Sequence, residues 1–149
     1  MAFDIEALLD LWTRLPADPV AAADAFRTLY TDPVVVNGAT LHADDLVARA
    51  RSLQQTFSGM DREVLDVCDA GDKVAVAFRL SGRQVGPLGT SAGALPPTDR
   101  DLALRVIDIL TLTDGRISEI TMVADELGAL VAVGAARLVT EGWRPDMRD

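Results

Sequence analysis

The last third of the chain decides the fold: DLALRVIDILTLT (101–113), Asp114-Gly115, RISEITMVAD (116–125) and ELGALVAVGAARL (126–138). An Asp-Gly pair between two runs rich in β-branched residues predicts a tight hairpin, because the turn needs residues that tolerate positive φ. The apolar run that follows predicts a helix over 126–138. Asp125 stands where the second strand meets this helix, so its carboxylate either caps the helix or takes part in chemistry.

The front of the chain has helical rather than alternating spacing. Apolar residues recur every three or four positions over 4–15, 18–30 and 42–57, which predicts three helices. Further elements are predicted from local patterns: a short strand at 34–37 (VVVN), a second hairpin in EVLDVCDA, Gly71-Asp72 and KVAVAFRLSGR (63–83), and a loop rich in Gly and Pro at 85–98.

Helices followed by a run of antiparallel strands predict an α+β fold. A curved sheet folded over its helices would leave a pocket between the two layers. The strand 101–113 is largely apolar on both faces, and a sheet of that kind must be covered on both. The helices can cover one face, so we expect a second subunit to cover the other in a homodimer.

Composition limits the function classes further. A length of 149 residues predicts one domain, with a core over 3–138 and a C-terminal tail over 139–149. The net charge of -9 argues against nucleic acid or an anionic membrane as a partner. No apolar stretch reaches the ~20 residues of a membrane span, and the acidic N-terminus predicts a cytoplasmic protein. The single cysteine, Cys68, excludes an internal disulfide and is expected to be buried.

Three stretches in order resemble one protein family. DAGDKVAVAFRLSGRQVG (69–86), LPPT (95–98) and IDILTLTDGRISEITMVAD followed by ELGAL (107–130) are similar to motifs of the SnoaL-like polyketide cyclases, or ester cyclases, of the NTF2-like superfamily. The resemblance runs from about residue 3 to residue 138. It implies a cone-shaped α+β barrel, in which a curved antiparallel sheet wraps around N-terminal helices and a C-terminal helix closes a deep apolar pocket. It also implies a homodimer.

The resemblance implies acid–base chemistry with no metal and no cofactor. Characterised members close a ring by intramolecular aldol condensation of an aromatic polyketide ester, and an Asp at the position that matches Asp125 is their general acid–base. An apolar cavity raises the pKa of a carboxyl group toward neutrality, where a base works best. The chain departs from the family pattern at Asp108 and Gln84, which replace histidines, and its only histidine is His42.

The predicted catalytic residues are Asp125 and Asp108, and each has an alternative interpretation. Asp125 is also a good helix cap, and Asp108 could form an ion pair with Arg105 or Arg79 inside an apolar strand. Whether the two acids share a face of the sheet depends on the hairpin. A two-residue turn places them on one face, and a bulge separates them.

The predicted substrate-binding residues are Asn37, Gln84, Tyr30, Trp12 and Thr121. Asn37 could donate a hydrogen bond to a substrate carbonyl or only turn the chain, and the two aromatic residues could be core. No spacing indicates a metal site. We therefore expect a cofactor-free cyclase that acts on a hydrophobic natural-product intermediate. The alternatives are an isomerase, a dehydratase or an epoxide-opening enzyme of the same superfamily, or a module that binds a ligand or a partner without chemistry.

Overall fold

The computed structural model describes residues 2–145. Its N-terminal half holds three helices, α1 (Ile5–Thr13), α2 (Pro19–Leu29) and α3 (Ala43–Thr56). The side chains of Asp4 and Asp18 cap α1 and α2 by accepting hydrogen bonds from the backbone N–H groups of Ala7 and Ala21. The three predicted helices are therefore confirmed, each within two residues of its expected ends.

A six-stranded sheet has the order β2-β1-β8-β7-β4-β3. Its strands are β1 (Tyr30–Val36), β2 (Ala39–Leu41), β3 (Phe57–Asp69), β4 (Lys73–Gln84), β7 (Asp101–Thr113) and β8 (Arg116–Ala124). All neighbours are antiparallel except β1 and β8, which are parallel. Most of the chain lies between these two strands, so no short turn forces them to run in opposite directions. The predicted α+β fold is confirmed, with this one parallel pair in addition.

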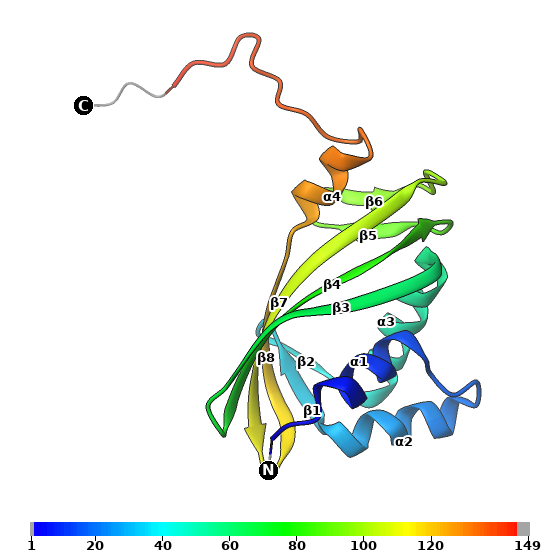
Figure 1. Cartoon of the computed structure of the whole chain (residues 1–149), viewed down its shortest axis with the longest axis vertical. Helices are drawn as coiled ribbons and strands as arrows, with labels where there is room; N and C mark the ends of the chain where they lie inside the picture. Colours follow the sequence, from blue (N-terminus) through cyan, green and yellow to red (C-terminus); the bar gives the residue numbers. More distant parts are fainter. Residues whose placement is uncertain (1, 146–149) are drawn as a thin grey trace.

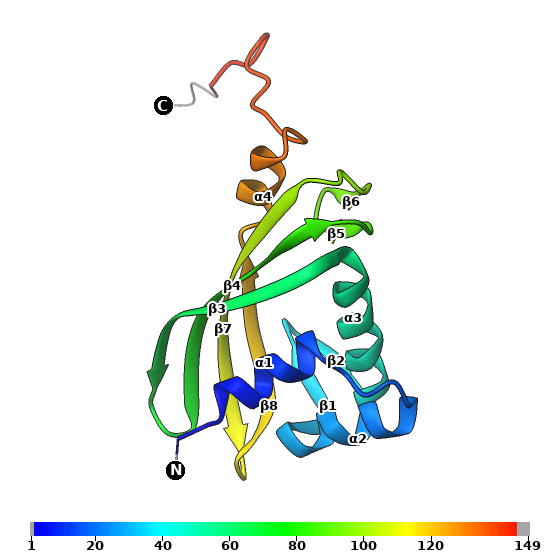
Figure 2. The same cartoon turned by 45° about the vertical axis from the view of Figure 1, so that its right-hand side comes forward.

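The sheet bends strongly, and the N-terminal helices lie against its concave side (Figures 1 and 2). Strand β7 shows why the core forms there, because its side chains alternate between buried and exposed along Asp101–Leu110. The buried set, which faces the helices, is Leu102, Leu104, Val106, Asp108 and Leu110. Burial of each of these apolar side chains contributes about 1.5–3 kcal/mol.

The β7–β8 hairpin contains the predicted turn and an irregularity beside it. Asp114 and Gly115 adopt positive φ, and Thr113 pairs with Arg116 across them. Next to this turn, Leu112 pairs with Ile117, but the following pair is Thr111 with Glu119. Ser118 is therefore an extra residue in β8. The Ser118 hydroxyl is bonded to the Thr113 hydroxyl at 2.8 Å and to the Thr111 carbonyl at 3.2 Å, and these bonds hold the bulge.

Two expected segments differ from the structure at the end that carries the C-terminal helix. The predicted loop 85–98 contains a small hairpin, β5 (Leu88–Thr90) with β6 (Gly93–Leu95). The helix predicted over 126–138 is wrong in length, because the helix observed there, α4 (Glu126–Ala132), is only seven residues long. Gly134 adopts a φ of 75° and bonds to the Val131 carbonyl, which is how a glycine ends a helix. The chain after it leads away from the body (Figures 1 and 2).

The expectation of a buried Cys68 is wrong, since this residue is exposed. It lies opposite Ala75 on the edge strand β3, on the face of the sheet that points away from the helices. An apolar run in an edge strand therefore does not imply burial here. None of the helices described is long and apolar enough to cross a bilayer.

Candidate active site

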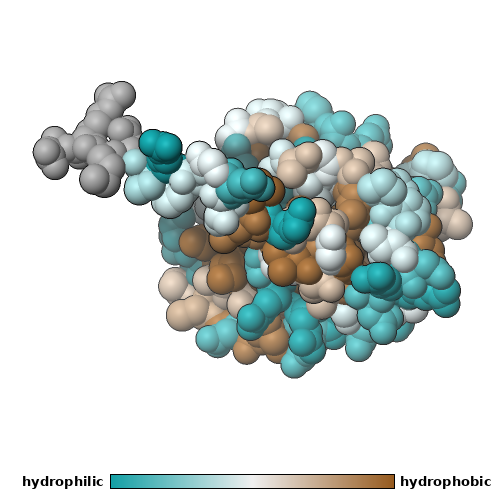
Figure 3. Space-filling model, turned by 90° about the horizontal axis from the view of Figure 1, so that it is seen from above, coloured by the Kyte–Doolittle hydropathy of each residue, from teal (hydrophilic) through white to brown (hydrophobic). Residues whose placement is uncertain are grey.

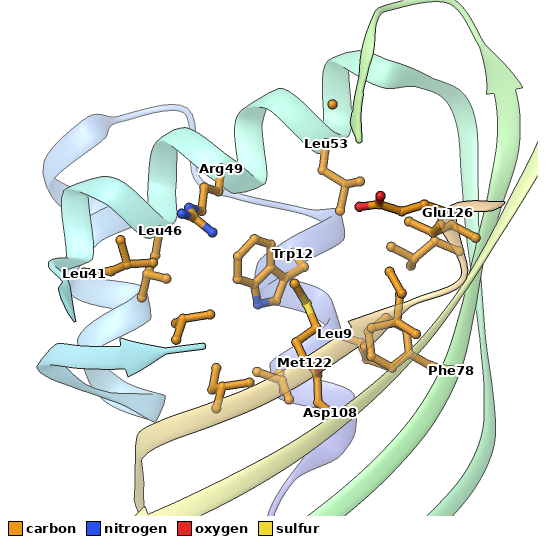
Figure 4. A pocket seen from close by; sticks show the side chains of 18 of the residues that line it. Leu9, Trp12, Leu41, Leu46, Arg49, Leu53, Phe78, Asp108, Met122 and Glu126 are labelled. Atoms are coloured by element: carbon orange, nitrogen blue, oxygen red, sulfur yellow. The ribbon is translucent and has the colours of Figure 1, made fainter. Parts of the chain in front are cut away.

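A cavity of about 300 Å³ lies between α1, α3 and the concave face of the sheet. This volume is in the range of sites for small organic ligands. Most of its wall is aliphatic, and it also includes two aromatic residues with polar atoms, Trp12 and Tyr30, and three charged residues, Arg49, Asp108 and Glu126. Figure 4 shows Trp12 of α1, Arg49 of α3 and Asp108 of the sheet converging on this cavity.

Asp108 is the acid that β7 places in the cavity wall. Its side chain is 9% exposed, and its Oδ1 atom has no hydrogen-bond partner within residues 2–145. Burial raises the pKa of this carboxyl to about 7, because the apolar surroundings disfavour its charged form. The ion pair with Arg79 or Arg105 is not formed. Both arginines lie on the opposite face of the sheet, and Arg79 pairs with Glu63 there.

Tyr30 and Trp12 form a polar pair in the cavity wall. The Trp12 Nε1–H donates a 2.8 Å hydrogen bond to the Tyr30 hydroxyl oxygen, and the Phe26 ring packs against both aromatic rings. Burial and the nearby Asp108 carboxylate raise the pKa of Tyr30 above its ordinary value, although the Trp12 bond opposes this. The tyrosine therefore stays protonated at neutral pH. Its O–H donates to no other described residue.

The structure places Asp125 outside the cavity, so the prediction that it lies at the pocket floor is wrong. Its side chain is exposed and accepts a 2.8 Å hydrogen bond from the backbone N–H of Gly128, as the N-cap of α4. A Cβ atom on Gly128 would lie 2.3 Å from the capping carboxylate, so a larger residue there would displace the Asp125 side chain from its capping position. The physical reason for the error is the extra residue Ser118, which moves Asp125 to the face opposite Asp108.

The same bulge displaces Thr121, which was predicted to contact substrate. Asp108 pairs with Met122 rather than with Thr121, so Met122 lines the cavity. Thr121 is exposed and lies opposite Ile109 on the outer face. Without the bulge, the two neighbours in β8 would exchange faces.

Asn37 and Gln84 also lie outside the cavity wall, because their amides bind the protein itself. Asn37 has a φ of 47°, and its side chain donates to the Met122 carbonyl at 3.2 Å and accepts from the Met122 N–H at 2.8 Å. Gln84 is fully buried, and it donates to the carbonyls of residues 86, 95 and 96 and accepts from Thr98. Both side chains fasten segments of the fold.

Among the residues of the cavity wall that sequence reasoning missed are Arg49, Met122 and Glu126. A signal for Arg49 is present, because it follows Leu46 by three positions and precedes Leu53 by four, on the same helical stripe. A cation between two leucines of an apolar helical stripe indicates that this stripe lines a pocket. Within residues 2–145, no three His, Cys, Asp or Glu side chains gather as metal ligands would.

The profile of the SnoaL-like polyketide cyclase family matches residues 5–133 of this sequence. The chain belongs to this family. The resemblance seen in the three motifs is therefore confirmed, and so is the expected NTF2-like fold of a curved sheet with N-terminal helices. No curated protein matches the chain in sequence.

Solved structures share the fold of this SnoaL-like chain at low sequence identity. TsrD from Streptomyces laurentii is 23% identical with a TM-score of 0.68, and the match covers 91% of this chain and 100% of TsrD. A SnoaL-like polyketide cyclase from Agrobacterium tumefaciens is 14% identical with a TM-score of 0.70, over 90% of this chain and 100% of that one. IdmH from Streptomyces antibioticus is 20% identical with a TM-score of 0.65, over 87% and 95%.

Proposed function

We propose that this protein is a cofactor-free cyclase that closes a ring in a hydrophobic, polyketide-type small molecule, with Asp108 as its general base. The observation that carries the proposal is an unpartnered carboxyl group in an apolar cavity, with its pKa raised to about 7. A base with this pKa is half-ionised near neutral pH, where proton transfer from carbon is most effective. Membership of the SnoaL-like family supports a cyclisation among the reactions that such a base can serve.

In the proposed reaction, the Asp108 carboxylate removes a proton from the carbon next to a substrate carbonyl, and an enolate forms. The enolate carbon attacks a second carbonyl of the same molecule, so a carbon–carbon bond forms and the second oxygen becomes an alkoxide. Protonated Asp108 then returns its proton to this alkoxide. The net result is an intramolecular aldol addition, in which no atom is gained or lost.

Tyr30 is the group that we propose to stabilise the enolate oxygen. Its hydroxyl already accepts from Trp12, which leaves its own hydrogen available to a substrate oxygen. Hydrogen bonds in a chain polarise one another, so the Trp12 bond makes the Tyr30 O–H a better donor. A donor held in place in a water-poor cavity is the usual means of stabilising such an oxyanion.

The proposed function can be tested without the natural substrate, through proton abstraction itself. An aromatic β-keto ester such as methyl 4-(2-naphthyl)-3-oxobutanoate, dissolved in D2O with the protein, should exchange its acidic hydrogens faster than the buffer rate. Proton NMR follows this exchange. Exchange at the buffer rate with every enolisable aromatic ester tried, or acceleration that persists in an Asp108→Asn variant, would contradict the assignment of the base.

A variant of Asp125 separates the two acids that the sequence suggested. Asp125→Asn is expected to keep wild-type exchange and turnover, and to change the free energy of unfolding by less than about 0.5 kcal/mol, because Asn caps a helix as well as Asp. The measurement pairs the exchange assay with urea unfolding. A large loss of activity with intact stability would instead return the catalytic role to Asp125.

We also propose that the protein is a homodimer joined through the outer face of the sheet. Cross-strand pairing places an apolar cluster at the centre of this face, formed by Cys68, Ala75, Ala77, Ile107, Ile109 and Val123. Ile107, Ile109 and Val123 are 55%, 44% and 69% exposed in the single chain. No described helix covers them, and a partner with the same patch would bury them.

Ile107→Asp tests the dimer. A buried, unpaired charge at the centre of such an interface should shift the dissociation constant by roughly 100-fold or more toward monomer. Analytical ultracentrifugation at micromolar concentration measures this shift. Val20→Asp is the matched control, because Val20 is also an exposed apolar residue but lies on α2. A wild-type protein that is monomeric throughout this range would refute the dimer.

A further inference from the structure

Arg49 is a cation set into an otherwise aliphatic part of the cavity wall. The stripe of α3 that faces the cavity consists of Leu46, Arg49 and Leu53. Figure 4 shows the Arg49 side chain extending from α3 into the cavity, while Asp108 comes from the sheet on the other side. It is the one cationic residue among the described residues that line this cavity.

The guanidinium of Arg49 has no carboxylate to pair with in the described part of the chain, and no hydrogen-bond acceptor there. Four other arginines of this acidic protein, Arg27, Arg62, Arg79 and Arg83, each form an ion pair. The other acid in the cavity wall does not neutralise it either.

That other acid is Glu126, which lies on a different element, at the start of α4. Its Oε2 atom accepts a 2.8 Å hydrogen bond from the backbone N–H of Ser91 and so holds the turn between β5 and β6. It makes no ion pair with Arg49 among the contacts of residues 2–145. Arg49 therefore offers an unused cationic donor to whatever fills the cavity.

A guanidinium is a planar fork that matches a carboxylate with two parallel hydrogen bonds. Sites for phosphate gather several donors, such as successive backbone N–H groups and more than one cation, whereas this cavity wall has a single arginine. The Arg49 side chain is exposed in the single chain, and an apolar ligand packed beside it would displace water and so strengthen a charge pair formed there. A carboxylate is the anion that fits this arrangement.

We infer that Arg49 binds a carboxylate of the substrate, so that the substrate is an apolar precursor with a free carboxylic acid at the end remote from the carbon that Asp108 deprotonates. The second part of this inference, the direction in which the substrate lies, rests on the proposed function. Arg49 holds the acid end near α3. The apolar body of the substrate fills the space between α3 and the sheet, and its enolisable carbon meets the orphaned carboxyl oxygen of Asp108.

A matched pair of probes tests the carboxylate site by binding alone. 2-Naphthoate and 2-naphthamide have the same ring and nearly the same shape, but only the first is an anion. Calorimetric titration near pH 6, where Asp108 is mainly neutral, should show that the wild type binds the naphthoate roughly tenfold or more tightly than the amide. Trp12 lies in the cavity wall, so its fluorescence in a Trp143→Phe background reports the same binding.

Three variants give the expected pattern. Arg49→Met keeps the aliphatic stem and should reduce the ratio of the two affinities to about one, while Arg49→Lys should keep part of the preference as a point charge. Arg14→Met removes the same charge from an exposed position outside the cavity and should leave the ratio unchanged. Thermal unfolding verifies that each variant is folded.

An unchanged ratio in Arg49→Met, or no preference in the wild type, would overturn the inference. These results are distinct from a failure of the proposed function. If Asp108→Asn abolishes proton exchange while Arg49→Met keeps the preference for naphthoate, the base assignment stands and the carboxylate site fails. If the preference depends on Arg49 but Asp108→Asn still exchanges at the wild-type rate, the carboxylate site stands and the catalytic proposal fails.

Discussion

Asp108→Asn is expected to lower turnover roughly 10²–10⁴-fold, because an amide cannot accept the proton that a general base removes. Asn has nearly the same shape as Asp and can occupy the same place in β7 between Met122 and the helices. The loss should therefore fall on the rate of the chemical step, with a small effect on binding of the naphthoate probe. The deuterium-exchange assay and steady-state turnover both measure it.

The matched control for this variant is Asp101→Asn. Asp101 belongs to the same strand but is exposed and lies outside the cavity wall. It loses the same charge, so equal losses of activity in the two variants would mean that net charge, not proton transfer, is responsible. A rate in Asp108→Asn within a few-fold of wild type would remove Asp108 from the mechanism.

Asp108→Asn should also make the protein more stable than the wild type at alkaline pH. The pKa of Asp108 rises from 3.8 in the unfolded chain to about 7 in the fold, so the folded state holds this proton more tightly. The contribution of protonated Asp108 to the free energy of unfolding is therefore fully present below about pH 4. It is lost between about pH 4 and about pH 7, because the unfolded chain ionises more readily. Because each pKa unit corresponds to about 1.36 kcal/mol, the total loss of unfolding free energy is roughly 4 kcal/mol.

Urea unfolding at two pH values measures this linkage. The gain in unfolding free energy of Asp108→Asn over wild type should grow by roughly 3 kcal/mol from about pH 5 to about pH 8. Asp101→Asn should show no such growth, since its carboxylate is exposed. A stability difference that is independent of pH would mean that Asp108 is not held in a charge-disfavouring site.

Gln84→Leu is expected to lower the free energy of unfolding by roughly 2–4 kcal/mol, the second large effect. The fully buried amide of Gln84 holds the carbonyls of Leu95 and Pro96 and both the N–H and the hydroxyl of Thr98. Leucine fills the volume but leaves these buried polar groups without partners, and each such group is costly. The segment 95–98 should loosen before the rest of the molecule.

Thermal and urea unfolding measure the loss, and hydrogen exchange locates it. Exchange should rise at the amides of 95–98 and stay at wild-type rates in the middle of β7. Gln55→Leu is the control, because this neighbouring glutamine is exposed and its side chain makes no hydrogen bond with the described residues. It should change stability by less than about 0.5 kcal/mol. Unaltered stability in Gln84→Leu would show that water replaces the lost bonds.

The end of the molecule that carries α4 bears on how much of the site is visible from sequence. Seen from above, apolar side chains gather in the middle of this face between hydrophilic ones (Figure 3). Leu127 and Val131 of α4 are 67% and 53% exposed, although their spacing predicts a buried helix face. Periodicity reports that a face is apolar, but only the neighbouring elements determine whether that face is covered.

The sequence by itself determined the type and order of the main elements and the apolar face of each. Caps such as Asp18 and the Asp114-Gly115 turn act over a few residues, so local rules are sufficient for them. The same holds for the family, because the three motifs are contiguous stretches. Of the proposed site residues, Tyr30, Trp12 and Asp108 do lie in the cavity wall.

Only the tertiary structure decided which acid faces the cavity. The side chains of a strand alternate between faces, so the one extra residue at Ser118 exchanges Met122 for Thr121 and turns Asp125 away from Asp108. That bulge depends on hydrogen bonds across the β7–β8 pair. The burial of Gln84 and the unpaired state of Arg49 likewise depend on segments far apart in the chain. A local pattern cannot specify such contacts, because they form only when the sheet closes over its helices.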